Sequence, residues 1–374
     1  MVLFPKDDFI GLDNNVHLAT GGQPPLLKAH RQAFEAFAHD KSIGMAGYER
    51  HWEVVDEVKF LLSQRTNLRA EEFALIGNAS EGIARVVSSF DWQKGDNAVM
   101  SALDYNSGKF SFIKLRQTGV EVRLVQPNEM FVDTDALIAA CDAKTRLIYI
   151  SQVNAHTGQK IDLVPLSHAL RARGIALLVD ASHALGVVPL DGQLCDFMVC
   201  STYKFLLGGH MGILAWNRTS WPEFEPMQVG WHSAAEGAQS GTYNLLPDGR
   251  RAEIGNANHM SVYVLRASLE YLSSVSEAAL ENHVAGLSKI LFSGLQALDL
   301  NILTPAEPGC RGPNISFRHS NPRVFAHKAA KDNILLWGEA GRVRASLHGF
   351  VSKADVRQLL DWLGANFDRL GMST

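Results

Sequence analysis

The sequence predicts an α/β fold: a doubly wound, mostly parallel sheet in a large domain, followed by a small C-terminal α+β domain. Up to about residue 220, short apolar runs rich in Val and Ile alternate with stretches of helical period, the order that βαβ units produce. A polar stretch rich in Gly and Pro, 221–255, then interrupts the pattern as a long loop. A length of 374 residues allows two or three domains. From the order of the motifs we expect two, residues 16–255 and residues 1–15 with 256–374.

Residues 25–64 carry apolar residues at three- and four-residue spacing, which predicts amphipathic helices. EFALIGN followed by ASEGIARVVSSF predicts a strand, a tight turn and a helix. Further strands are expected in DNAVMSAL, VEVRLVQP, RLIYISQV, GIALLVD and CDFMVCS, and further helices in DLVPLSHALRARG, at 258–276 and in ADVRQLLDWLGANF.

Composition excludes several classes of protein. Lys and Arg number 35 against 39 Asp and Glu, a net charge of −4, so there is no basic footprint for nucleic acid or an anionic membrane surface. Four cysteines without a CxxC pair argue against a disulfide framework and a cysteine zinc site. The sequence also contains no HExxH motif, so it gives no sign of a metal site. The first residues lack a signal-peptide pattern, and no uncharged run approaches the ~18 residues of a membrane span. We expect a soluble, reduced, cytoplasmic protein without a metal.

Chemistry-bearing residues follow the predicted strands at their carboxyl ends, where parallel sheets bind ligands. Asp180 closes one apolar strand, and Lys204 comes shortly after the end of the next. The turn GNASEG leads from a strand into a helix, whose free amides form an anion site in which Ser80 caps the helix or holds a phosphate. A lysine, a buried acid and a phosphate site together fit pyridoxal phosphate.

Four segments then resemble one family. They are GNASEG, LLVDASHALGVVPLD, DFMVCSTYKFLLGGHMGIL and RVRASLHGFVSKADVRQLLDWL, in this order along nearly the whole chain. They are similar to the class V aminotransferases of fold-type I pyridoxal phosphate (PLP) enzymes, which include cysteine desulfurases, isopenicillin N epimerase and kynureninase. The resemblance implies the fold-type I transferase fold and PLP as cofactor.

The resemblance also assigns roles to the cofactor residues. It implies that Lys204 forms the Schiff base and afterwards moves the Cα proton of the substrate. Asp180 would pair with the pyridine nitrogen, and His183 would reach the phenolic oxygen of the cofactor. The phosphate contacts implied in this way are Ala79, Ser80, Ser201 and Tyr203.

Three further cofactor contacts are implied by position. Tyr105 matches the residue that stacks on the pyridine ring. Asn154 is a candidate cofactor contact, because the match slips by one residue in VNAHTG. Asn256 matches a residue that reaches the phosphate from the neighbouring subunit, which implies a homodimer with shared active sites.

The substrate side rests on three residues. The resemblance implies that Arg344, expected in a turn between strand and helix, grips the substrate carboxylate in a bidentate pair. Trp231 and His232 could shape the substrate pocket. Packing as ordinary loop aromatics is an equal alternative for both residues.

The branch of the family follows from what is missing. Cysteine desulfurases carry a mobile-loop cysteine before the C-terminal Arg, and AHKAAKDNILLWGEAGRVR has none; Cys310 lies farther back and is interpreted as structural. Tyr105 and Tyr203 also stand where desulfurases have histidines. We favour β-elimination of the C–S lyase type on a small α-amino acid, through a Schiff base and loss of the Cα proton. The alternatives are a transaminase, then a kynureninase-like hydrolase or an epimerase, and from another class a non-catalytic relative of the fold.

Overall fold

The computed structural model describes residues 2–235 and 241–366. The helices are α1 (Ala29–Ser42), α2 (Met45–Thr66), α3 (Ala79–Ser88), α4 (Asn106–Lys114), α5 (Thr134–Ala139), α6 (Leu163–Arg171), α7 (His259–Leu272), α8 (Glu277–Ala297), α9 (Pro322–Lys331) and α10 (Lys353–Ala365). The strands are β1 (Val16–His17), β2 (Phe73–Ile76), β3 (Asn97–Ser101), β4 (Glu121–Val125), β5 (Thr145–Ser151), β6 (Ala176–Asp180), β7 (Phe197–Ser201), β8 (Gly212–Trp216), β9 (Ala234–Ala235), β10 (Asn244–Leu245), β11 (Asn314–Arg318), β12 (Ile334–Leu335), β13 (Trp337–Glu339) and β14 (Arg342–Ser346).

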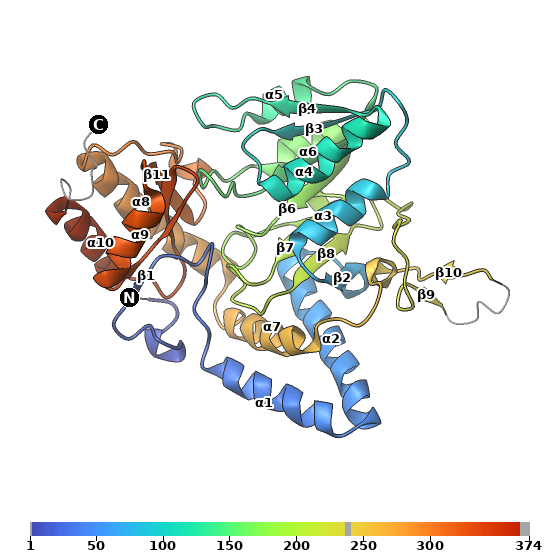
Figure 1. The fold of residues 1–374 in the computed structure, drawn as a ribbon, viewed down its shortest axis with the longest axis horizontal. Helices are drawn as coiled ribbons and strands as arrows, with labels where there is room; N and C mark the ends of the chain where they lie inside the picture. The colour runs from blue at the N-terminus through green and yellow to red at the C-terminus, as the bar shows by residue number, and fades with distance from the viewer. Residues whose placement is uncertain (1, 236–240, 367–374) are drawn as a thin grey trace.

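A seven-stranded sheet organises the larger part of the molecule (Figure 1). Its strand order is β2-β8-β7-β6-β5-β3-β4, and β8 alone runs antiparallel to its two neighbours. The mostly parallel, doubly wound sheet expected from the sequence is confirmed. The predicted strands 73–76, 97–101, 121–125, 145–151, 176–180 and 197–201 all form, whereas β8 was not anticipated as a strand of its own.

Both faces of this sheet are buried, because successive side chains of a strand point to opposite sides. On β6, Leu178 packs with α3 and α4 in one apolar cluster, whereas Leu177 and Val179 belong to another that includes α2, α6 and α7. Apolar side chains therefore continue along each strand without a polar alternation, which explains the continuous apolar runs in the sequence.

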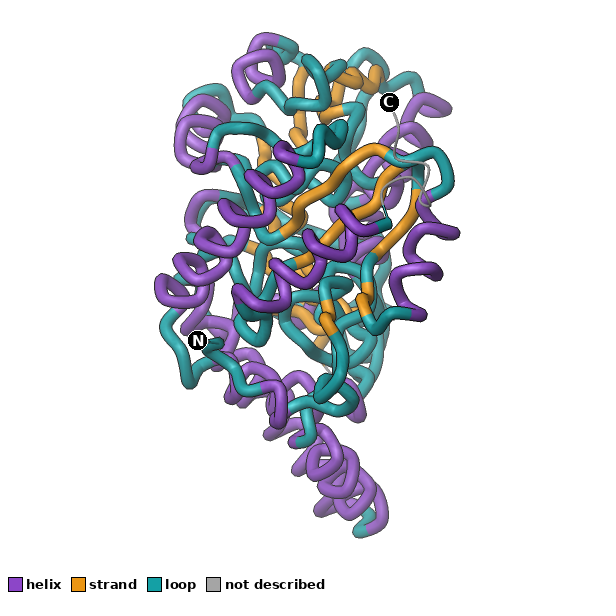
Figure 2. Tube along the Cα trace, turned by 90° about the vertical axis from the view of Figure 1, so that its left-hand side faces the viewer, coloured by secondary structure: helices purple, strands orange, loops and turns teal. Residues whose placement is uncertain are grey.

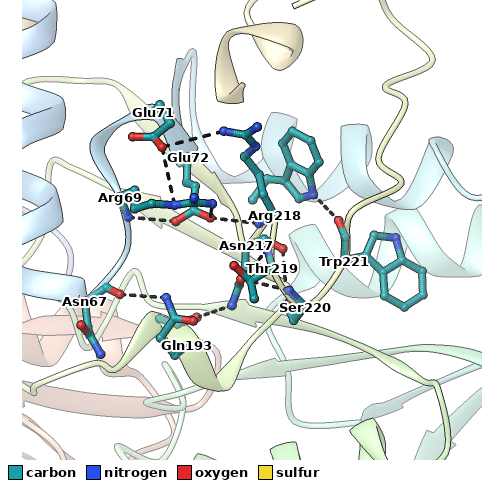
Figure 3. A network of polar contacts seen from close by, with 12 residues as sticks. Asn67, Arg69, Glu71, Glu72, Gln193, Asn217, Arg218, Thr219, Ser220 and Trp221 are labelled. Carbon is teal, nitrogen blue, oxygen red and sulfur yellow. Dashed lines mark hydrogen bonds and ion pairs between the residues drawn. The ribbon is translucent and has the colours of Figure 1, made fainter. Parts of the chain in front are cut away.

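The amino ends of the parallel strands are closed by paired polar groups (Figure 3). Glu72, directly before β2, is 1% exposed, and its carboxylate accepts from the Arg69 guanidinium at 2.8 Å and the Arg218 amide at 3.0 Å. Asn217, just after β8, accepts from the next two backbone amides after Arg218 and donates to the Cys195 carbonyl. The polar groups at this end of the sheet are therefore paired with one another. We expect the functional site at the opposite end, where the carboxyl ends of the parallel strands lie.

A second, antiparallel sheet of order β11-β14-β13 forms the C-terminal part with α8, α9 and α10 (Figure 1). The N-terminal segment runs beside it, since β1 pairs with β12 and Ala19 bridges Ser346. Helix α7 contacts α1 and α2, which meet in a corner at the lower end of both views (Figures 1 and 2). The division of the chain at residues 16 and 255 stays a prediction.

Candidate active site

A cavity of about 260 Å³ opens at the carboxyl ends of β6 and β7, between the two sheets. Residues from the N-terminal segment, the large sheet and the small sheet meet there. Its lining consists of Gly21, Gly22, Ala79, Ser80, Tyr105, Ser107, Ala155, Asp180, Ser182, His183, Ser201, Tyr203, Lys204, Trp337, Glu339, Arg342 and Arg344. Nine of the thirteen residues expected at the site therefore come together in one cavity; the four outside its lining are Asn154, Asn256, Trp231 and His232.

Asp180 is the last residue of β6 and is 8% exposed. The Tyr149 hydroxyl donates to its Oδ2 at 3.2 Å, and the Ser182 amide donates to its Oδ1 at 2.8 Å. These two donors compensate part of the cost of burying a carboxylate. They also hold the carboxylate at the cavity wall, where it can meet a cationic group of a ligand.

Lys204 lies three residues beyond β7 in the same cavity. Burial lowers the pKa of its amine below the ordinary lysine value, while the charge of Asp180 opposes this shift and that of Arg344 adds to it. A lowered pKa favours the free amine, the form that attacks carbonyl carbon. Gly186 lets the two loops pack closely, because a Cβ there would lie 2.3 Å from the carbonyl oxygen of Phe205.

Helix α3 begins at the cavity. The Asn78 side chain caps it by accepting from the Glu81 amide at 2.9 Å, and the preceding helical residues Ala79 and Ser80 line the cavity. The first amides of a helix lack intrahelical partners and carry the positive end of its dipole, so this is an anion site. The Ser80 hydroxyl lies 2.7 Å from that of Ser107, which adds a second hydroxyl beside it.

His183 is held as a neutral imidazole with one defined tautomer. Burial lowers the pKa of His183 well below its usual range, and the Lys204 charge adds to this. The Ser346 hydroxyl donates to Asn314 Oδ1 at 2.8 Å, so the Asn314 amide nitrogen is the donor to His183 Nδ1 at 3.0 Å. We assign the proton of His183 to Nε2 from this network, which leaves Nε2 as a donor.

Arg344 lies in the middle of β14, so its expected position in a turn between strand and helix is wrong. It is 3% exposed, and its Nη1 donates to the Ala155 carbonyl at 2.9 Å. Burial and then the neighbouring Arg342 charge lower the pKa of Arg344 to about 9. The strand continues past Arg344 because it pairs with β11 as far as Ser346, whereas its pairing with β13 ends at Arg344.

Asn154 does not line the cavity, although its neighbour Ala155 does. Its Oδ1 accepts from the His156 amide at 2.9 Å, and its Nδ2 donates to the Leu103 carbonyl at 3.1 Å. This side chain therefore holds a turn, in agreement with the one-residue slip in the motif. Asn256 also lies outside the lining of the cavity of its own chain.

Trp231 and His232 lie in a different hollow, of about 230 Å³, beside α2. His232 Nδ1 pairs with Glu253 at 3.0 Å, and its ring stacks on Trp52 with centroids 4.4 Å apart. Trp231 is 62% exposed. The structure does not bring these two residues to the cavity of the same chain.

Several lining residues escaped the sequence reasoning. Gly21 and Gly22 cross the small sheet so closely that a Cβ on Gly22 would lie 2.3 Å from the Trp337 ring, and one on Gly21 3.1 Å from Arg344. Only the pair of glycines hints at this contact in the sequence. Arg342 could have been found from the alternation RVR, which places two arginines on one face of a strand.

Among residues 2–235 and 241–366, no helix is long and apolar enough to cross a bilayer. The same residues contain no group of three or more His, Cys, Asp or Glu side chains able to hold a metal ion.

A carboxylate at one strand end, a lysine of lowered pKa after the next strand and a helix N-terminus share one cavity. Together they fit the pyridine nitrogen, the aldehyde and the phosphate of PLP, and they define a PLP-dependent enzyme of fold type I. The Aminotransferase class-V family model matches residues 46–359, and the chain belongs to this family. The expected family, fold, cofactor and enzymatic class are thereby confirmed.

Similar sequences occur in an archaeon and in a yeast. A probable cysteine desulfurase of Methanothermobacter thermautotrophicus is 24% identical over 90% of this chain and 89% of its own length. An uncharacterised protein of Schizosaccharomyces pombe is 28% identical over 67% of this chain, and the match spans 60% of that protein.

Solved structures agree on the fold. A variant of C-DES with glycine linked covalently to its PLP cofactor has a TM-score of 0.89 at 21% identity, over 96% of this chain and 99% of the other. The cysteine desulfurase of Thermococcus onnurineus has a TM-score of 0.88 at 17% identity, over 98% of both chains.

Proposed function

We propose that this enzyme cleaves the side chain of a small sulfur-containing α-amino acid by β-elimination and does not pass sulfur to a cysteine of its own. One observation carries the proposal: no cysteine belongs to the cavity lining, all of which lies in the described residues. Cys141, Cys195 and Cys200 are buried outside the lining, although Cys200 directly precedes the lining residue Ser201, and Cys310 lies in a short 3-10 helix, Pro308–Cys310. A related structure of similar fold is named a cystine C–S lyase, which supports this branch.

The residues of the chain divide the work. PLP supplies a ring that stabilises the negative charge left when the Cα proton departs. Lys204 would hold its aldehyde and later carry the proton, Asp180 would keep its pyridine nitrogen protonated, and His183 would donate from Nε2 to its phenolic oxygen. Tyr105 would cover the ring; its own ring centroid lies 5.7 Å from Lys204 Nζ.

The phosphate end would be held by Ala79 and Ser80 at the helix start, with Ser201 and Tyr203 beside them. The Ser201 and Tyr203 hydroxyls are 3.4 Å apart, so both can turn to one anion. Arg344 would bind the substrate α-carboxylate with its charge.

We also propose a homodimer with shared active sites. Asn256 stands outside the cavity of its own chain, and large apolar side chains close to it in sequence are exposed, Ile254 at 45% and Met260 at 45%, as is Phe60 of α2 at 58%. Exposed apolar patches of this kind mark protein interfaces. Trp231 and His232 could serve substrate only in the partner's cavity. A chain that is active and monomeric by light scattering would contradict this assembly.

The products of L-cysteine test the proposed reaction. Elimination releases sulfide, pyruvate and ammonia, whereas sulfur transfer to a protein cysteine leaves alanine. We expect pyruvate and ammonia in equal amounts, and no product with Lys204→Ala, which also loses the visible band of the cofactor Schiff base. Cys310→Ala is the matched control and should keep the pyruvate rate.

Two other outcomes would redirect the function. Alanine as the product, lost in Cys310→Ala, would establish a desulfurase and overturn the proposal. A keto acid that forms only when a second keto acid is supplied would establish the transaminase alternative. If the wild-type protein cannot be loaded with PLP, the remaining hypothesis is a non-catalytic relative of the fold.

A further inference from the structure

Strand β14 presents two arginines to the cavity. Arg342 and Arg344 are two residues apart on a strand, so their side chains lie on one face. They are 5% and 3% exposed, and both line the cavity that contains Lys204. The Nε atom of each is buried and has no hydrogen-bond partner among the described residues.

The contacts that these guanidinium groups do make are all to uncharged carbonyl oxygens. Arg344 Nη1 and Arg342 Nη2 donate to the Ala155 carbonyl at 2.9 and 3.3 Å, and Arg342 Nη1 lies 3.3 Å from the Glu339 carbonyl oxygen. Neither side chain forms an ion pair with any carboxylate of residues 2–235 and 241–366. Two adjacent buried cations without a counter-charge are costly.

The two carboxylates that line the cavity with this pair already have other partners, and Glu339 acts on both arginines only as a charge that partly opposes the lowering of their pKa. The Glu339 carboxylate, 47% exposed, binds Arg323 at 3.1 Å and the Trp337 indole at 3.3 Å. Asp180, at the other end of the cavity, accepts from a tyrosine and from a backbone amide. The positive charge of this pair also affects His156, since burial and then the Arg342 charge lower the pKa of His156 to about 3. One substrate α-carboxylate would compensate only one of the two guanidinium groups.

We infer that Arg342 binds a second anionic group, carried by the side chain of the substrate, while Arg344 binds the α-carboxylate. This rests on the proposed function and narrows its substrate class to α-amino acids with an acidic side chain. For β-elimination the substrate is a cysteine whose sulfur bears an anionic substituent. The Cα proton passes to Lys204, the Cβ–S bond breaks, and the sulfur leaves as a thiolate with its anion; water converts the remainder to pyruvate and ammonia.

A matched pair of substrates tests the inference. S-carboxymethyl-L-cysteine and S-carbamoylmethyl-L-cysteine differ only in a carboxylate against an amide of the same shape. Binding to the holoenzyme is followed by calorimetry and by the change in the visible band, and turnover by pyruvate. The wild type should bind and turn over the acid about tenfold to a hundredfold better than the amide, the difference expected from one hydrogen bond to a charged group.

The variants separate this role from a structural one. Arg342→Met should abolish the preference for the acid, Arg342→Lys should retain part of it, and Arg344→Ala should weaken both compounds to a similar degree. A coloured wild type without preference overturns the role of Arg342 and leaves the proposed function standing. The same holds if Arg342→Met weakens both compounds equally, since the side chain then only holds the Ala155 loop. A wild type that takes up no PLP overturns both proposals.

Discussion

Two clusters of buried charge in this molecule are built in opposite ways. In the first, Glu253 pairs with Lys59 at 2.8 Å and with His232 at 3.0 Å. Burial alone would raise the pKa of Glu253, but the Lys59 charge and the hydrogen bonds hold it at about 2. In the second, Arg342 and Arg344 have no acidic partner among the described residues, and burial lowers the pKa of both.

The difference separates structure from function. A buried charge that finds its partner within the chain joins two elements; Glu253 connects the long loop to α2 and also accepts from the Leu75 amide of β2. A buried charge without a partner stays unfavourable until a ligand supplies one. His232, which the sequence suggested for the substrate pocket, lies in the compensated cluster, whereas Arg342, which it did not suggest, lies in the uncompensated one.

The largest effect should come from breaking the compensated cluster. Lys59→Met leaves the Glu253 carboxylate buried without its cation, and we expect the free energy of unfolding to fall by about 3–5 kcal/mol. Urea unfolding of the holoenzyme measures it. The double variant Lys59→Met, Glu253→Gln removes both charges and should recover much of the loss. A single variant as stable as the wild type would show that this pair is not a structural link.

The opposite pattern is expected for Arg344→Ala. Its removal takes away a buried charge that forms no ion pair with the described residues and that only the Tyr105 and Glu339 charges partly offset, so stability should hold or rise. The value of kcat/KM should fall by an amount equivalent to about 2–4 kcal/mol, because the buried carboxylate of the substrate would lose its charged partner. Steady-state kinetics and urea unfolding on one preparation separate the two quantities, with Arg344→Lys as the conservative control. A variant that loses stability but keeps kcat/KM would reverse the comparison.

The sequence predicted which residues at the ends of the large sheet line the cavity, because their signals are local. Asp180 ends an apolar run, Ser80 stands at a strand-to-helix turn, and Lys204 follows the next strand within one short loop. In a parallel sheet these ends meet at one edge, so element order alone brings them together. The single antiparallel strand β8 was missed because the same residues belong to the lysine motif.

The wall of the cavity that the N-terminal segment and the small sheet form could not be predicted in the same way. Gly22, Trp337 and Arg342 meet only because the N-terminal segment runs back across the small sheet, and nothing local in the sequence encodes that contact. The placement of His232 fails for a related reason: its partner Glu253 is 21 residues away, and pairing depends on how the loop 221–255 folds.

The smallest effect should come from Asn314, which positions His183 and does not line the cavity itself. Asn314→Leu removes the donor to His183 Nδ1, so the ring can place its proton on that atom and lose the donor at Nε2. We expect kcat/KM to fall by an amount equivalent to about 1.5–3 kcal/mol, the value of one hydrogen bond to a charged oxygen. Asn314→Asp offers Nδ1 an acceptor in place of a donor and favours the wrong tautomer, so it should shift the pH at which the visible band of the cofactor changes. If both variants leave that titration where it is in the wild type, the contact between Asn314 and His183 is packing alone, and the tautomer is set elsewhere.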